Sequence, residues 1–412
     1  MADFFQNGEI SNLHRLNPND ADKLEKRLEH FSRQNPVALV LPALFHDLTA
    51  APIRTILTEI SRVRYLNEVI VTLGKTDAGQ FAEAKQILRS FDMPIAIVWN
   101  NSEPLRELYQ ILKDHGVSVG DDGKGRSTWM AYGYVLARES SRVIVLHDCD
   151  IVTYSRELLA RLCYPVVNPN LGYEFCKGYY ARFTDRLHGR VTRLFATPLI
   201  RALKKIIGST DFLEYLDSFR YILAGEFSMQ SDLARINRIP GDWGLEVGVL
   251  AEIYRNCSRR RICQVEIADQ YEHKHQPLSE CDPSTGLNKM SIDIAKTILR
   301  TMASMGTLFP AGWTKTLKAT YLRTAQDAVA KYCDDSEING LFFDRHRETI
   351  AVETFARALE LACEEFERDA VGKPRIPNWN RVTSAIPNFF DRLLEAVEVD
   401  SRSEERRVGK EC

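Results

Sequence analysis

Two carboxylates stand two residues apart at the end of an apolar run. Asp148 and Asp150 follow residues 142–146, and Cys149 separates them. Alternate side chains of an extended chain point the same way, so both carboxylates would face one side. Mg²⁺ prefers oxygen ligands, is often shared between carboxylates and substrate phosphates, and can neutralise a departing diphosphate. The plainer interpretation is a strand end followed by a polar turn.

A glycine-rich segment, residues 120–128, precedes a helix predicted over residues 127–139. Backbone N–H groups at a helix start, together with Lys124 and Arg126, could hold a phosphate. The segment is not a P-loop, because that motif has Ser or Thr after its Gly-Lys pair and here Gly125 follows Lys124. A flexible turn with a capping serine is the alternative.

Cations and hydroxyl groups gather in two further segments, residues 174–182 and 188–192. These segments, with the residues between them, contribute Lys177, Arg182, Arg186, Arg190 and Thr192. Such groups suit an acceptor that carries a phosphate or a carboxylate. Surface charge on a helix is the alternative for Arg182 and Arg186.

Two isolated acids and two histidines complete the candidate residues. Glu226 and Glu246 lie beside glycines in apolar surroundings, where a buried acid needs a partner. His273 and His275 would project the same way from an extended segment, and an imidazole could complete a metal site begun by the carboxylates. Glu246 could instead be an ordinary acid at a helix start, and the histidines a surface cluster.

The chain around these residues predicts an α/β fold. Short apolar, β-branched runs at residues 37–41, 68–72, 94–98 and 142–146 read as buried strands. Helical patterns at residues 52–63, 80–91 and 105–115 lie between them, which predicts a parallel, doubly wound sheet. Ligands bind beyond the carboxyl ends of such strands, where residues 42–47 and 147–150 fall.

The character of the chain changes along its length. We expect a helical extension over residues 1–34, a catalytic domain over 35–287, and a helical module over 288–400 that covers the catalytic domain or mediates dimerisation. The module would contain helices at residues 290–305, 314–332, 348–368 and 382–397. Residues 401–412 are charged and aperiodic, resemble translated vector sequence, and are expected to be a non-native or disordered tail.

The composition excludes several classes of protein. With 54 basic and 56 acidic residues the net charge is −2, so no basic surface for nucleic acid is indicated. No apolar stretch approaches the length of a membrane span, and the N-terminus lacks an apolar signal core. The nine cysteines show no C-x-x-C pair, which favours reduced thiols in a cytoplasmic protein.

These segments, in this order, resemble the glucosyl-3-phosphoglycerate synthase family over residues 35–290. The resemblance implies a GT-A fold, Rossmann-like with a mainly parallel sheet flanked by helices, and a helical C-terminal module. It implies a retaining enzyme that moves glucose from UDP-glucose to the 2-hydroxyl of 3-phosphoglycerate. The partners would be a nucleoside diphosphate sugar and a small phosphorylated or carboxylated acceptor, with Mg²⁺ or Mn²⁺ as cofactor, in a homodimer.

The resemblance also implies roles for individual residues. The segment Pro42-Ala43-Leu44 would contact the uridine, with Asp47 close by, and Lys124 would approach the diphosphate. Asp150 and His273 would bind the cation, with Asp148 at the ribose or the metal. The segment Gly189-Arg190-Val191-Thr192 would bind the acceptor, with Lys177 nearby. Leu223-Ala224-Gly225-Glu226 would lie near the sugar, and Glu246 would contact the sugar or acceptor.

One departure from the family pattern concerns the acceptor. Some members have an arginine two residues before the metal-binding histidine and an asparagine two residues after it, where this chain has Tyr271 and His275. Both are kept as candidate substrate-binding residues. GDP-mannose as donor and glycerate as acceptor stay open, as do a nucleotidyltransferase and a non-catalytic sugar-nucleotide binder.

Overall fold

The computed structural model describes residues 6, 8–17, 21–241, 244–273, 278, 282 and 284–402. One sheet in this part of the chain has the strand order β1-β8-β6-β7-β5-β2-β3-β4. Its strands are β1 (Ser11–Leu13), β2 (Val37–Leu44), β3 (Leu66–Gly74), β4 (Ile95–Trp99), β5 (Val143–Leu146), β6 (Phe175–Tyr180), β7 (Phe227–Gln230) and β8 (Ile262–Ala268). Strand β7 runs antiparallel to β5 and β6, and the other neighbours are parallel. The four predicted strands and their parallel pairing are confirmed.

Continuous apolar runs form these strands because both faces of the sheet are covered. In β2, Ala38 and Val40 belong to one core, whereas Leu39 and Leu41 belong to the other. The first core is shared with α5 (Glu103–Asp114), α6 (Lys124–Arg138), and α16 (Phe389–Arg402). The second is shared with α1 (Ala21–Phe31), α3 (Ala51–Ile60), α4 (Ala78–Arg89), and α7 (Arg156–Val167). The expected α/β fold is therefore confirmed, with helices on both faces.

The remaining helices lie between the strands or after β8 in the sequence. They are α2 (Phe45–Thr49), a π-helix (Val191–Ala196), α8 (Thr197–Ile207), α9 (Asp211–Asp217), α10 (Ser231–Ile236), α11 (Leu245–Asn256), a 3₁₀ turn (Arg259–Arg261), α12 (Gly286–Ser304), α13 (Trp313–Ile338), α14 (Arg345–Arg368) and α15 (Trp379–Ala385). No described helix is long and apolar enough to cross a membrane.

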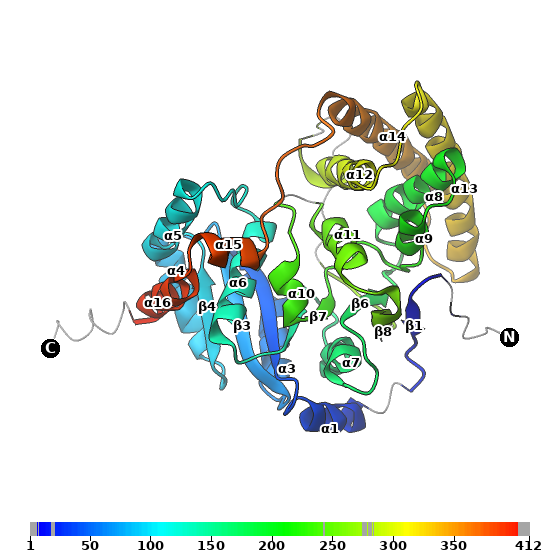
Figure 1. Cartoon of the computed structure of the whole chain (residues 1–412). Coiled ribbons are helices and arrows are strands. Elements are labelled where there is room, and N and C mark those ends of the chain that lie inside the picture. The colour runs from blue at the N-terminus through cyan, green and yellow to red at the C-terminus, as the bar shows by residue number, and fades with distance from the viewer. Residues whose placement is uncertain are drawn as a thin grey trace.

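The C-terminal helices lie in two groups (Figure 1). Figure 1 shows α12, α13 and α14 gathered beside α8 and α9, whereas the chain after α14 descends to place α15 and α16 beside α5 and α6. Trp379 stacks on Trp129 of α6, with ring centroids 4.0 Å apart, and Trp129 Nε1 donates to the carbonyl of Pro377 at 2.8 Å. The last helices thus complete the sheet's own core.

Two expectations at the ends of the chain are wrong. The single helix expected over residues 382–397 is divided into α15 and α16, because Pro387 lacks an N–H and clashes with the preceding turn. The N-terminal extension is not wholly helical, because β1 pairs with β8 at the sheet edge. A strand as short as β1 carries too few residues for its period to be read.

The expected tail boundary at residue 401 falls inside α16, which ends at Arg402. The buried ammonium of Lys85 donates to the carbonyls of Asp400 at 3.2 Å and Ser401 at 3.0 Å. We expect a chain ending at Arg402 to melt at the temperature of the full chain. A chain ending at Val399 should melt a few degrees lower, because a lost hydrogen bond to a charged group costs about 1.5–3 kcal/mol. Differential scanning calorimetry measures both, and equal melting of the two truncations would contradict the role given to Lys85.

Candidate active site

A cleft of about 2160 Å³ opens at the carboxyl ends of β2, β3 and β5 and extends toward α12. It is lined by most of the predicted site residues, namely Pro42, Ala43, Leu44, Asp47, Lys124, Asp148, Asp150, Gly189, Arg190, Val191, Thr192, Leu223, Gly225, Glu246 and His273. Segments far apart in the sequence therefore meet at the sheet edge where a doubly wound fold binds its ligands.

The two aspartates flank a residue that points into the core. Cys149 is buried, and its thiol donates to the carbonyl of Pro42 at 3.2 Å. This bond ties the end of β2 to the segment after β5 and leaves Asp148 and Asp150 on the cleft. The expected alternation of side chains is confirmed.

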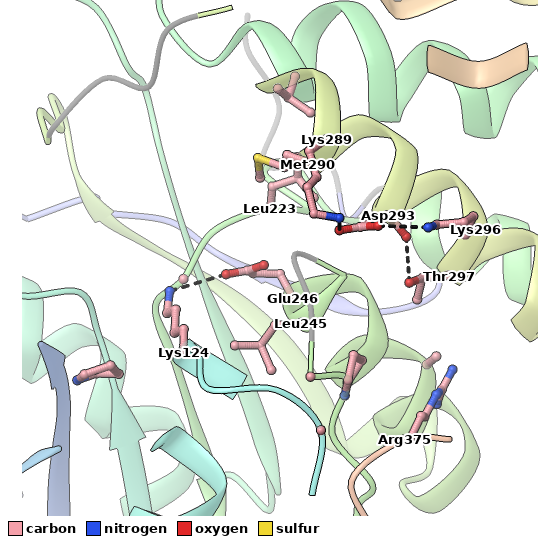
Figure 2. Close-up of a pocket in the computed structure, with 18 of the residues that line it drawn as sticks. Lys124, Leu223, Leu245, Glu246, Lys289, Met290, Asp293, Lys296, Thr297 and Arg375 are labelled. Carbon is pink, nitrogen blue, oxygen red and sulfur yellow. Dashed lines mark hydrogen bonds and ion pairs between the residues drawn. The ribbon is translucent and has the colours of Figure 1, made fainter. Parts of the chain in front are cut away.

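Lys124 lies between two acids at the first turn of α6. Its ammonium is 2.7 Å from Asp148 Oδ1 and 3.4 Å from Glu246 Oε1, and Figure 2 shows Lys124 and Glu246 pointing toward each other. Burial alone would raise the pKa of Asp148, but the charge and hydrogen bond of Lys124, together with the nearby His273 and His147, lower that pKa. Both partners are therefore ionised, and one cation is held at the helix start that was predicted to approach phosphate.

A glycine allows Asp148 its position. A Cβ added to Gly225 would lie 2.9 Å from Asp148 Oδ2, closer than a real Cβ contact. The segment Leu223–Gly225 therefore passes directly against the carboxylate, and Leu223 and Gly225 line the cleft while Ala224 is buried.

Asp150 and His273 form the pair predicted to bind a metal. The backbone of Ile151 bridges that of His273, and Val152 N donates to Glu272 O at 2.8 Å. The imidazole Nδ1 consequently lies 3.7 Å from Asp150 Oδ2. Asp150 Oδ1 is buried and has no hydrogen-bond partner among the described residues.

These residues fit a divalent cation that also binds the substrate. Within the described part of the chain, no group of three His, Cys, Asp or Glu side chains could cage a metal. A buried carboxylate oxygen without a donor, next to an imidazole, offers two ligands and leaves the other positions open. Mg²⁺ sites that share their ion with substrate phosphates have this incomplete protein shell.

Glu226 lies behind the cleft wall. It is 1% exposed and accepts hydrogen bonds from the hydroxyls of Tyr180 at 2.7 Å and Tyr271 at 2.5 Å. Burial and then the charge of Asp148 raise the pKa of Glu226, against the stabilising tyrosine hydroxyls. Tyr271 stacks on Tyr180 with ring centroids 3.7 Å apart and meets His273 edge to face. Glu226 and Tyr271 thus support the wall that carries His273, and the expected place of Glu226 near the sugar and of Tyr271 at the substrate stays a prediction.

Lys177 is likewise withdrawn from the cleft. Its side chain is 1% exposed, and its ammonium donates to the carbonyl of Ala224 at 2.6 Å. Burial lowers its pKa to about 8. A lysine at this depth supports the Leu223–Gly225 segment from behind, and the substrate contact of Lys177 stays a prediction.

The acceptor segment begins with a turn and continues as the π-helix. Gly189 has a φ of +72°, and a Cβ there would lie 3.0 Å from the Tyr221 hydroxyl. Arg190 Nε donates to Glu348 of α14 at 2.7 Å, and its side chain is 36% exposed. Thr192 is 6% exposed, and its hydroxyl is buried without a partner in the described chain. π-Helical turns often mark functional sites, and this one, which begins directly after Arg190, brings Thr192 to the cleft.

Two predicted residues call for separate mention. Asp47 lines the cleft and also shapes it, because Asp47 Oδ2 accepts from Leu44 N at 2.9 Å. His275 lies outside the described residues.

Sequence reasoning missed the contribution of α12. Lys289 and Lys296 flank the carboxylate of Asp293 at 3.2 and 3.1 Å, and Figure 2 shows this group facing the part of the cleft opposite Lys124. The three residues share one helix face because they are spaced four and three apart. That spacing could have been found, but nothing in the sequence joins it to a sheet edge far away in the chain.

Comparison with known proteins gives the same assignment. No protein-family model matches the chain. A glucosyl-3-phosphoglycerate synthase of Persephonella marina is 47% identical over 401 residues, which cover 97% of this chain and 99% of that protein. A glucosyl-3-phosphoglycerate synthase of Methanococcoides burtonii is 37% identical over 386 residues, which cover 92% of this chain and 94% of that protein.

Solved structures show the fold. Glucosyl-3-phosphoglycerate synthase from Mycobacterium tuberculosis, in complex with Mn²⁺, UDP-glucose and phosphoglyceric acid, superposes with a TM-score of 0.53 at 23% identity, covering 74% of this chain and 89% of that one. Mannosyl-3-phosphoglycerate synthase from Rubrobacter xylanophilus gives 0.52 at 19% identity, covering 73% and 83%. The fold is GT-A, and the two full-length relatives decide the rest: the chain belongs to the glucosyl-3-phosphoglycerate synthase family and is a hexosyltransferase.

Proposed function

We propose that this chain transfers glucose from UDP-glucose to the 2-hydroxyl of 3-phosphoglycerate, with retention and with Mg²⁺ or Mn²⁺. The names of its full-length relatives support the reaction. The observation that carries it is the continuity of one cleft. Lys124, Asp150 and His273 line this cleft, and so do Arg190 and Thr192 of the acceptor segment.

The part around Lys124 suits the nucleoside diphosphate. Pro42, Ala43 and Leu44 form the wall for the uridine, next to Asp148. The ammonium of Lys124, fixed by Asp148 and Glu246, would compensate the charge that develops on the diphosphate as the sugar leaves. A divalent cation held by Asp150 and His273 would supply further charge compensation at the same oxygens.

The part around Arg190 suits a small anionic acceptor. Arg190 is oriented by Glu348, and a guanidinium forms paired, charge-assisted hydrogen bonds with a phosphate. The unpartnered hydroxyl of Thr192 would add a donor. Leu223, Gly225 and Glu246 lie where the sugar would pass from one substrate to the other.

No residue takes the role of an enzymatic nucleophile in this mechanism. The acceptor hydroxyl attacks the anomeric carbon from the face that the diphosphate leaves. One carbon–oxygen bond forms as the other breaks, and the hydroxyl proton passes to the leaving diphosphate oxygen. The chain's residues orient the two substrates and exclude water.

A matrix of donors and acceptors tests the proposal, with product masses measured in Mg²⁺, in Mn²⁺ and in EDTA. Donors are UDP-glucose and GDP-mannose, and acceptors are 3-phosphoglycerate, glycerate and glycerol 3-phosphate. We expect the highest kcat/KM for UDP-glucose with 3-phosphoglycerate and almost no product in EDTA. Preference for GDP-mannose or for glycerate would overturn the donor or the acceptor assignment. Formation of a sugar nucleotide from a nucleoside triphosphate and a hexose phosphate would assign nucleotidyl transfer instead.

The homodimer and the cytoplasmic location stay predictions. Analytical ultracentrifugation of the chain ending at Arg402 measures the first.

A further inference from the structure

A second arginine faces the acceptor part of the cleft. Arg182 follows β6 and lines the cleft together with Arg190 and Thr192. Its Nη1 donates to the hydroxyl of Tyr221 at 3.1 Å. Its Nε is buried and has no hydrogen-bond partner in the described part of the chain.

An unpartnered guanidinium N–H in a buried position is costly. Burying a donor of a charged group without an acceptor costs more free energy than a typical hydrogen bond contributes to stability. Such groups are therefore rare unless a ligand accepts their hydrogen bond. Thr192 presents a second unpartnered donor in the same cleft. The Tyr221 hydroxyl accepts a hydrogen bond from Arg182 and also lies against Gly189, so Arg182 adjoins the start of the acceptor segment.

The backbone fixes Arg182 between the metal-binding pair and the acceptor segment. Tyr271 N donates to the carbonyl of Ala181 at 3.0 Å, which ties Arg182 to the segment that carries His273. His188 N donates to the carbonyl of Arg182 at 2.8 Å, which ties it to the acceptor segment. Arg190, in contrast, is anchored to Glu348 of α14.

The two charged groups of 3-phosphoglycerate differ in their distance from the reacting hydroxyl. The carboxylate is bonded directly to the carbon that bears this hydroxyl. The phosphate is separated from that carbon by a methylene group and an ester oxygen. A hydroxyl aimed at the sugar beside the Asp150–His273 pair therefore brings the carboxylate closer to that pair than the phosphate.

We propose that Arg182 binds the carboxylate of the acceptor and so determines its specificity, whereas Arg190 and Thr192 bind the phosphate. This assignment rests on the proposed function. A guanidinium suits the task, because its planar fork matches a carboxylate with two parallel hydrogen bonds.

The experiment crosses two variants with three acceptors. Arg182→Gln and Arg190→Gln are assayed with 3-phosphoglycerate, glycerate and glycerol 3-phosphate, and an analogue that is not turned over is measured as a competitive inhibitor. Arg182→Gln should lower the kcat/KM for 3-phosphoglycerate and for glycerate about 10- to 100-fold, or raise the inhibition constant by the same factor. The corresponding constant for glycerol 3-phosphate, which has no carboxylate, should be nearly unchanged. Arg190→Gln should change the same constants for 3-phosphoglycerate and glycerol 3-phosphate by a similar factor, and the constant for glycerate much less.

Arg201 of α8 provides a control on a different element. Its side chain is 55% exposed, and its Nε pairs with Asp217 at 3.2 Å. Arg201→Gln removes the same charge and should change the kcat/KM for each acceptor less than threefold. Arg182→Lys should recover only part of the loss, since an ammonium cannot form the paired contact. Calorimetric binding of UDP with Mn²⁺ and thermal melting should be unchanged in Arg182→Lys.

The outcomes separate this inference from the proposed function. If the wild type does not glucosylate 3-phosphoglycerate, the proposed function fails and the inference fails with it. If the wild type is active but Arg182→Gln weakens glycerol 3-phosphate as strongly as 3-phosphoglycerate, Arg182 does not bind the carboxylate. Equal losses in UDP binding would make Arg182 a residue of the fold and would also overturn the inference.

Discussion

Asp150→Ala should lower turnover at least about 10³-fold while the protein remains folded. A metal ion contributes several kcal/mol to charge stabilisation, and each 1.36 kcal/mol is about tenfold in rate. The carboxylate has one buried oxygen without a partner, so its removal breaks no hydrogen bond of that oxygen within the described chain. Initial rates with Mn²⁺ and thermal melting, measured on the same preparation, give the two quantities.

The companion variant and the control locate the effect at the metal. His273→Ala should lower the affinity for Mn²⁺ in a calorimetric titration with UDP present. The His273 imidazole and the Asp150 carboxylate lie 3.7 Å apart and would share the ion. Asp327→Ala removes a half-exposed acid on α13 that pairs with Arg323 at the surface, and it should alter neither the rate nor the metal binding. Near-normal turnover in EDTA or in Asp150→Ala would overturn the metal-dependent mechanism.

Local patterns predicted the sheet because both of its faces are buried. A run such as residues 37–41 can be buried on two sides only as a central strand between helices, and four such runs fixed four parallel strands. The same runs located the site, since Asp148 and Pro42 each stand where a strand ends. The thiol of Cys149 between the acids then shows why the alternation holds: it is bonded to the end of the neighbouring strand.

Local sequence patterns did not predict how deeply a side chain is buried or which distant residues it contacts. Glu226 and Glu246 look alike in sequence, each an acid beside glycine, yet one is closed in by Tyr180 and Tyr271 and the other faces Lys124. Tyr271 appeared only as a departure from the family pattern, and its stacking on Tyr180 could not be predicted because Tyr180 lies far away in the chain. Such differences are set by contacts between distant segments, which no local period reports.

Lys124→Met should lower kcat about 10²–10³-fold, the usual cost of removing one preorganised donor from a developing negative charge. The loss should appear in kcat more than in the Kd of UDP-glucose, because the diphosphate gains charge only as the sugar leaves. Stopped-assay rates at saturating donor, with UDP-glucose binding measured by calorimetry, separate the two. Lys318→Met, at a surface ammonium of α13 that pairs with Glu360 at 2.6 Å, should change either quantity less than twofold.

A double-mutant cycle distinguishes the direct action of Lys124 from its effect on Asp148. The ammonium is 2.7 Å from Asp148, so Lys124→Met leaves that carboxylate and Glu246 close together without their shared cation. If Lys124 served only to hold Asp148, Lys124→Met combined with Asp148→Asn would be no worse than Asp148→Asn alone. We expect the double variant to be at least about tenfold slower than Asp148→Asn, because the missing ammonium also leaves the departing diphosphate without one of its counter-charges. Equal rates for the double variant and Asp148→Asn would reduce Lys124 to a positioning residue.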